Sequence, residues 1–192
     1  MRCVAIVAAL SLVAVPALAE PVPLPSVDYV ASGNMGNRGT LTVRHHGDKL
    51  RTDMQMAAMP VPTLIIVDLK THKAVIHMPL PGVAGAMEVD LGDAGGLGPV
   101  AGEGTKSGTA TVGGEPCDLW QMTSRKTTNE LTACITADGI HLRTEVTVEG
   151  TRQVLMEMTE VKREAQDPGL FELPPGIPII RQPGAPSPAP NR

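Results

Sequence analysis

Hydrophobic and polar residues alternate with a period of two over long stretches of this sequence. In the segment 140–149, mostly aliphatic residues occupy one set of alternating positions, and charged or polar residues occupy the other. Such alternation is typical of strands that bury one face and expose the other, as in antiparallel sheets. The apolar positions of the three clearest segments are Leu50, Met54 and Met56; Ile140, Leu142, Val146 and Val148; and Val154, Met156 and Met158.

Short turn signals separate these alternating runs. Dipeptides such as Gly47-Asp48 and Gly113-Gly114 are favoured in the tight turns of hairpins. The sequence therefore predicts a mainly β protein, a meander of about ten antiparallel strands joined mostly as hairpins. The expected strands are 27–32, 38–46, 49–56, 63–69, 73–78, 105–112, 116–123, 130–136, 140–149 and 152–162.

Helix signals are almost absent. Only residues 84–91 suit a short helical turn, and Gly82, Gly85 and Gly92 oppose anything longer. The surrounding stretch 79–104 is rich in glycine and proline and interrupts the strand pattern. A loop of this length is more often a lid or a binding loop than a simple connection.

The first nineteen residues have the features of a secretory signal peptide. Arg2 provides the positive start, an apolar stretch follows, and Ala17-Leu18-Ala19 forms a small-x-small cleavage site before Glu20. A membrane anchor is the alternative, but the uncharged stretch falls short of the ~20 residues that span a bilayer and Pro16 breaks it. The sequence thus predicts a periplasmic or secreted protein of a Gram-negative bacterium.

The rest of the chain has the length of one domain. We expect a single β domain over residues 20–177 and a disordered, proline-rich tail over 178–192. No second segment is long and apolar enough to span a membrane, so we expect no transmembrane segment after removal of the signal.

The composition excludes one class of partner and indicates how the core is built. The net charge is −4 and only 2% of the residues are aromatic, which argues against nucleic acid as a partner because binding it takes a basic face and stacking aromatics. With Tyr29, Trp120 and Phe171 as the three aromatic residues, the core must be built from aliphatic residues and methionine. A methionine-rich surface suits promiscuous apolar binding, although ordinary core packing fits equally well. Trp120 fits either core packing over a hairpin or the wall of a cavity.

Cys117 and Cys134 are the two cysteines beyond the predicted signal, and in an oxidising compartment we expect them to pair. A hairpin that turns between Arg125 and Lys126 would place the two cysteines directly opposite each other, within reach of a disulfide. A redox-active pair is the weaker alternative, because the spacing is not Cys-x-x-Cys.

The sequence contains no nucleophile elbow, phosphate-binding loop or other enzyme signature, so we expect no catalytic residues, no enzymatic activity and no cofactor. Copper binding is a more specific chemical alternative, because imidazole and thioether are ligands that copper prefers. Met54 and Met56 lie on one face of an expected strand, but the same positions suit the apolar core, so no metal site is assigned. The candidate copper ligands are His45, His46, His72, His77, Met54, Met56, Met59 and Met78.

Four parts of the chain together resemble an uncharacterised family of exported bacterial proteins. They are the paired runs 63–69 and 74–79, a Gly-x-Pro-Cys-x-x-Trp element at 114–120, an Ala-Cys-(Leu/Ile)-Thr-x-Asp-Gly string at 133–143, and an Asp-Pro-x-Leu-Phe close at 167–176. That family is similar to the lipoprotein-carrier-like (LolA-like) superfamily. The resemblance implies a curved antiparallel half-barrel whose concave apolar face holds acyl chains. The carriers close their half-barrel with helices, which this sequence lacks.

These observations lead to three functional hypotheses. The first is a non-enzymatic periplasmic protein that binds an apolar or amphiphilic ligand, a lipid or an acylated peptide, on the concave face of the sheet. The second is an envelope structural or protein-interaction module that pairs through a sheet edge, and the third is the copper binder. The predicted ligand-binding residues of the first hypothesis are Leu50, Met54, Met56, Leu142, Val146, Met156 and Met158.

Overall fold

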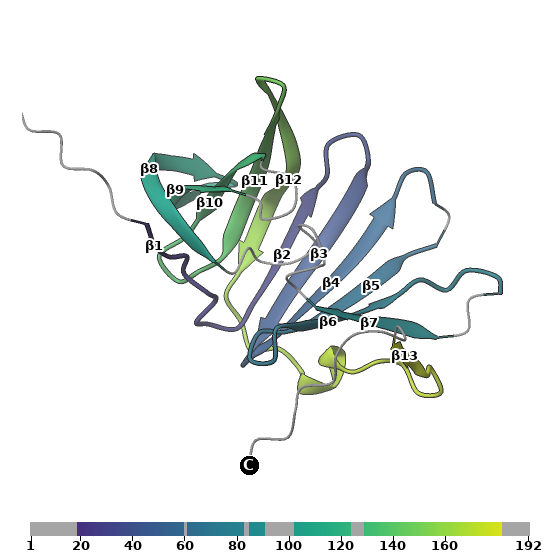
Figure 1. The fold of residues 1–192 in the computed structure, drawn as a ribbon. Coiled ribbons are helices and arrows are strands. Elements are labelled where there is room, and N and C mark those ends of the chain that lie inside the picture. Colours follow the sequence, from purple (N-terminus) through teal and green to yellow (C-terminus); the bar gives the residue numbers. More distant parts are fainter. Residues whose placement is uncertain (1–18, 60, 83–84, 91–101, 124–128, 182–192) are drawn as a thin grey trace, which may run out of the picture.

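The chain folds around a single curved sheet (Figure 1). The computed structural model describes residues 19–59, 61–82, 85–90, 102–123 and 129–181. Thirteen strands form the sheet, in the order β1-β8-β9-β10-β11-β12-β2-β3-β4-β5-β6-β7-β13. Every neighbouring pair is antiparallel except β13, which runs parallel to β7. The elements are β1 (Glu20–Pro21), β2 (Tyr29–Asn34), β3 (Gly39–His46), β4 (Lys49–Met56), β5 (Thr63–Asp68), β6 (Lys73–His77), β7 (Ala86–Asp90), β8 (Glu103–Val112), β9 (Glu115–Thr123), β10 (Glu130–Ile135), β11 (His141–Val148), β12 (Thr151–Lys162), the 3-10 turn η1 (Pro168–Phe171) and β13 (Ile179–Arg181).

The predicted fold class is confirmed: the protein is mainly β, with one curved sheet and little helix in the described part of the chain. Each of the ten predicted runs corresponds to one strand, and β1, β7 and β13 were not predicted. The expected helical turn at 84–91 is wrong where the structure describes it, because Ala86–Asp90 forms β7. A single helical turn beside glycine is marginal, whereas the extended segment gains hydrogen-bonded neighbours on both sides, β6 and β13.

The two ends of the predicted domain differ in how far the structure describes them. Residues 1–18, most of the predicted signal, lie outside the described residues, and Glu20–Pro21 pairs with β8. At the other end Ile179–Arg181 forms a strand inside the predicted tail, so the sheet extends beyond the expected boundary at 177. Residues 91–101 of the glycine-rich stretch, and residues 182–192, are also outside the described part.

Two runs of sequential neighbours, β2–β7 and β8–β12, meet at one seam, where β12 pairs with β2. The backbones approach closely there: a Cβ on Gly33 would lie 2.2 Å from the Glu157 carbonyl oxygen. The β12–β2 register shifts between Met158 and Glu160, and the β11–β12 register shifts between Thr144 and Glu145. Irregularities of this kind bend a sheet and increase its twist.

The β8–β12 half curls back on itself. The turn between β8 and β9 lies against β12, since a Cβ on Gly113 would lie 3.0 Å from the Met158 carbonyl oxygen. Figure 1 shows this half as a tightly curved group of strands beside the broader β2–β7 half. The curling brings side chains from non-neighbouring strands into one concave space.

Two hydrophobic clusters stabilise the sheet. The main cluster draws on both halves, and the smaller one gathers around Trp120. Trp120 therefore packs as core, with the Lys106 ammonium 5.1 Å from the ring centre. The buried members of the main cluster are Tyr29, Ala31, Met35, Leu41, Leu50, Ile65, Val67, Leu69, Ala74, Val112, Cys117, Cys134, Ile140, Leu142 and Met158, and those of the smaller cluster are Val22, Trp120, Met122, Ala133 and Ile135.

Residues 163–181 form a C-terminal strap across the β2–β7 half. The strap begins with Arg163, which pairs with Asp138 and Glu115, and it ends in β13. Midway, the Arg51 guanidinium donates to the Leu170 carbonyl at 2.7 Å. Arg51 shares a sheet face with its partner Ile66, so the strap lies over the face of β5 that turns away from the main cluster. This explains why β5 is apolar on both faces, without alternation.

Candidate functional site

Six of the seven predicted ligand-binding residues belong to the main cluster or pack against it. Leu50, Leu142 and Met158 are buried members. Met54, Met56 and Met156 are partly buried and pack against the cluster. The sequence pattern therefore brought together residues that share one apolar region, part of it core and part of it reachable from solvent.

Val146 does not join this group. The register between β10 and β11 shifts after Cys134, because Cys134 pairs with Arg143 while Ile135 pairs with His141. Leu142 is the extra residue of this bulge. Strict alternation over 140–149 places Leu142 and Val146 on one face, but Val146 lies opposite Leu131, which packs against the smaller cluster. An inserted residue reverses the side-chain alternation that follows it.

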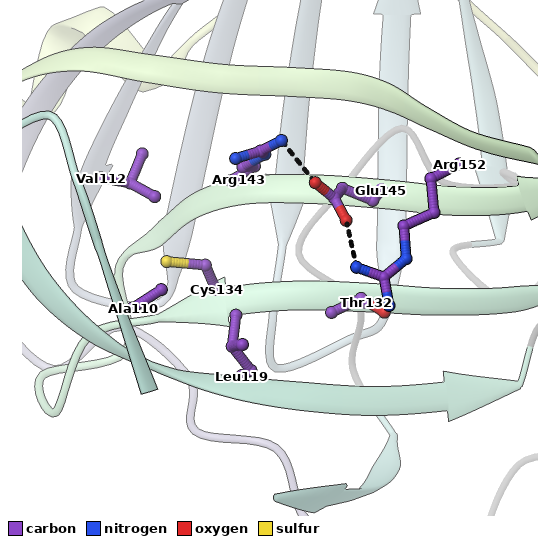
Figure 2. A pocket seen from close by; sticks show the side chains of 8 residues that line it. All are labelled: Ala110, Val112, Leu119, Thr132, Cys134, Arg143, Glu145 and Arg152. Carbon is purple, nitrogen blue, oxygen red and sulfur yellow. Dashed lines mark ion pairs between the residues drawn. The ribbon is translucent and has the colours of Figure 1, made fainter. Parts of the chain in front are cut away.

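A pocket opens inside the curled half of the sheet (Figure 2). Its volume is about 170 Å³, well above the ~10–15 Å³ that a single water requires. All five strands from β8 to β12 contribute to its walls, so it depends on the curling of this half. The lining residues are Ala110, Val112, Leu119, Thr132, Cys134, Arg143, Glu145 and Arg152.

The floor of the pocket is apolar. Val112 and Cys134 are buried members of the main cluster, and Ala110 and Leu119 pack against it. The pocket is therefore a place where the main core reaches the surface. An apolar group in the pocket would continue the packing of that core.

The Cys117–Cys134 disulfide, confirmed by the structure, braces this floor. The two Cα atoms are 5.4 Å apart, within the range that a disulfide bridges. The expected register is wrong by two residues, because Cys134 lies opposite Leu119 and not opposite Cys117. The bond therefore runs diagonally between β9 and β10, and Cys117 is also the cross-strand partner of Ala110.

Charged side chains form the rim of the pocket. The Arg143 guanidinium contacts the carboxylates of Glu145 and Glu157, the latter at 3.3 Å from Nε. On the other side, Nη1 of Arg152 lies 3.8 Å from Oε2 of Glu145. Figure 2 shows the Glu145 carboxylate between the two guanidinium groups. The site thus combines an apolar floor with a polar rim, a composition typical of ligand pockets.

An apolar row also reaches the open edge of the broader half. Ile65, Ile76, Met87 and Ile180 are successive cross-strand partners on β5, β6, β7 and β13. The exposed fraction rises along this row, from 1% at Ile65 to 41% at Met87 and 45% at Ile180. The apolar face that carries Met54 and Met56 is therefore accessible from the sheet edge.

The histidines are dispersed and mostly serve the structure. His45 stacks on Tyr29 and contacts the Val27 carbonyl through Nδ1, while His46 on the opposite face contacts Asp28 at 2.7 Å. Together with a backbone hydrogen bond from Gln166, His46 holds the pKa of Asp28 below its ordinary value. No group of three or more histidine, cysteine or acidic side chains is placed to hold a metal within the described residues.

Sequence reasoning missed the charged residues of the pocket rim. Arg143 and Glu145 occupy the positions that alternation assigns to the solvent face, and Arg152 follows a turn. The bulge at Leu142 and the curling of β8–β12 bring these residues together. Neither feature leaves a mark in the hydrophobic pattern of a single sequence.

Comparisons with known proteins bear on the fold alone. No family model matches the chain, and no curated protein matches it. A solved structure of an uncharacterised conserved protein from Thermus thermophilus is similar, with a TM-score of 0.55 and 14% sequence identity. The match covers 82% of this chain and 91% of the Thermus protein. At this identity the likeness concerns architecture.

The described residues also include no helix with the length and hydropathy needed to cross a bilayer.

Proposed function

We propose that this protein is an exported, non-enzymatic binding protein for an apolar or amphiphilic ligand. The observation that carries the proposal is the pocket of the curled half, whose floor belongs to the main core and whose rim carries ion pairs. Such a site buries an apolar chain and keeps a polar group near water. Each methylene of the chain that leaves water contributes about 0.8 kcal/mol.

The partly buried methionines support the same proposal. Met54, Met56 and Met156 pack against the main cluster without being enclosed by it. Methionine side chains are flexible and polarizable, so they adjust to ligands of different shape. The resemblance to carriers of acylated proteins agrees with this chemistry, and the row that includes Ile76 and Met87 is further apolar surface on the broader half of the sheet.

Export is part of the proposal. The signal-like first nineteen residues and the Cys117–Cys134 disulfide agree with an oxidising compartment such as the periplasm. A carrier in that compartment would shield apolar groups from water between membranes. Non-covalent binding needs only the pocket and the apolar face, with no catalytic group.

The test is a calorimetric titration with dodecyl maltoside below its micelle-forming concentration, using a variant that fills the pocket. Ala110→Leu places a larger side chain on the floor, and Thr111→Leu, whose exposed side chain points to the opposite face of β8, is the matched control. We expect saturable binding to the natural protein and to the Thr111 variant. We expect at least a tenfold loss of affinity for the Ala110 variant. Unchanged binding to Ala110→Leu, with a folded variant by circular dichroism, would show that the pocket is not the site.

A second function is favoured by the exposed edge of the sheet. β13 is the last strand in the order, and Ile179 and Ile180 are 47% and 45% exposed. Edge strands with unpaired backbone groups accept further strands from a partner. If the protein is an envelope interaction module, crosslinking from β13 will recover one stoichiometric protein partner and no lipid.

A further inference from the structure

The charged side chains of the pocket rim lie at different depths below the surface. The Glu145 side chain is 15% exposed, whereas the Arg152 side chain is 72% exposed. One oxygen of Glu145 faces Arg143 and the other faces Arg152, as Figure 2 shows. A molecule that approaches from solvent therefore meets the Arg152 guanidinium before it meets the Glu145 carboxylate.

The pairing of these charges is uneven. Arg143 contacts two carboxylates, those of Glu145 and Glu157. Arg152 shares Glu145 at 3.8 Å, a separation too long for a hydrogen bond. The two arginines and the two glutamates balance in charge, but Glu157 pairs with Arg143 alone, so Arg152 is the arginine that is left loosely paired.

We propose that the pocket selects amphiphiles whose headgroup is anionic, a carboxylate or a phosphate, with Arg152 as the residue that recognises it. The inference rests on the proposed function and adds the chemistry of the headgroup. The apolar floor of Ala110, Val112 and Leu119 receives the start of the chain.

The chemistry of arginine favours an anion over the alternatives. A guanidinium presents five N–H donors in a planar fork that matches carboxylate and phosphate oxygens. The pocket wall adds the Thr132 hydroxyl, which shares a face with its cross-strand partner Glu145. A cationic headgroup would have to displace Arg152 to reach Glu145, and a neutral headgroup would leave the guanidinium unmatched.

The experiment compares ligands that share one chain and differ in headgroup. Dodecanoate, dodecyl maltoside and dodecyltrimethylammonium are titrated into the full chain below their micelle-forming concentrations, with inorganic phosphate as a headgroup without a chain. We expect dodecanoate to bind about fivefold more tightly than dodecyl maltoside, since ~1 kcal/mol is the upper range for a solvent-exposed ion pair. We expect weaker binding of the cationic amphiphile and of phosphate, and an advantage of dodecanoate that shrinks as salt is added.

Variants locate the effect. Arg152→Gln should remove the preference for dodecanoate over dodecyl maltoside, and Arg152→Lys should retain part of that preference. Arg181→Gln is the matched control, because Arg181 is equally exposed and ion-paired with Glu88, but lies on β13.

Failure of the headgroup inference and failure of the proposed binding function would give different results. Equal affinity for dodecanoate and dodecyl maltoside, or an unchanged preference in Arg152→Gln, overturns the headgroup inference and leaves the proposed function standing. Binding of inorganic phosphate as tight as that of dodecanoate also overturns it, because the chain would then contribute nothing. If no amphiphile binds to any variant, the proposed function itself fails.

Discussion

At the scale of single residues, the burial of His141 makes the stability of the protein depend on pH. Its imidazole is buried at the start of β11, and Nε2 has no hydrogen-bond partner among the described residues. Burial disfavours the charged ring and lowers the pKa of His141 to about 4, compared with about 6.5 in an unfolded chain. Between these two pH values, His141 binds a proton in the unfolded chain but stays neutral in the folded protein. The free energy of unfolding therefore decreases as the pH falls from about 6.5 to about 4.

We predict that His141→Leu flattens this acid dependence. A shift of this size corresponds to about 2 kcal/mol lost by the natural protein between neutral pH and about pH 5. Urea unfolding at the two pH values measures it. Four carboxylates with lowered pKa values also make stability depend on pH, but mainly at lower pH. They lose their stabilising charge only below their ordinary pKa values of about 4. They are Asp28, Asp68, Glu88 and Asp138. A variant that keeps the full loss between neutral pH and pH 5 would contradict the role of His141.

At the scale of elements, the alternating pattern was sufficient to place ten strands but not to set their faces. Leu50, Met54 and Met56 follow regular alternation, and all three meet the main cluster as predicted. Val146 lies after the bulge at Leu142, and regular alternation places it on the wrong face. A bulge is defined by the partner strand, so one strand's own sequence does not reveal it. The three missed strands β1, β7 and β13 are short, and their pairing with distant segments stabilises them.

The seam between β12 and β2 gives a prediction at the same scale. Gly33→Ala would place a methyl group 2.2 Å from the Glu157 carbonyl oxygen, so the two backbones must separate. We expect a loss of about 2 kcal/mol or more in the free energy of unfolding, the range for backbone strain at a packed site. Gly102→Ala is the control, because a Cβ there meets no atom within 4 Å and should change stability by less than about 0.5 kcal/mol. Equal stability of the two variants in urea would show that the seam is not tightly packed.

At the scale of the whole molecule, the C-terminal strap ties the end of β12 to the far edge of the sheet. Phe171 is its buried anchor, 5.9 Å from the His46 ring. We predict that Phe171→Ala costs about 3–5 kcal/mol, as is usual when a buried phenylalanine is truncated. Leu170→Ala, at the exposed neighbouring position, should cost far less. Thermal unfolding of both variants is the measurement, and a similar loss for the two would contradict the anchoring role of Phe171.

The site was only partly predictable because the pocket depends on the arrangement of the whole sheet. Local alternation predicts the apolar residues of the proposed binding face, whereas the pocket needs the curling of five strands and the diagonal Cys117–Cys134 bond. Its recognition residue, Arg152, lies eighteen positions from Cys134 in sequence, yet both line the same space. Long-range geometry of this kind follows from the register of the whole sheet.

Native mass spectrometry of the protein isolated from the periplasm tests the central claim most directly. We predict a second mass, heavier than the chain by one small amphiphile, which organic extraction removes and added dodecanoate restores. Protein that is consistently free of ligand, and that ignores both dodecanoate and dodecyl maltoside, would contradict the account. A stoichiometric protein partner in place of the small ligand would contradict it as well.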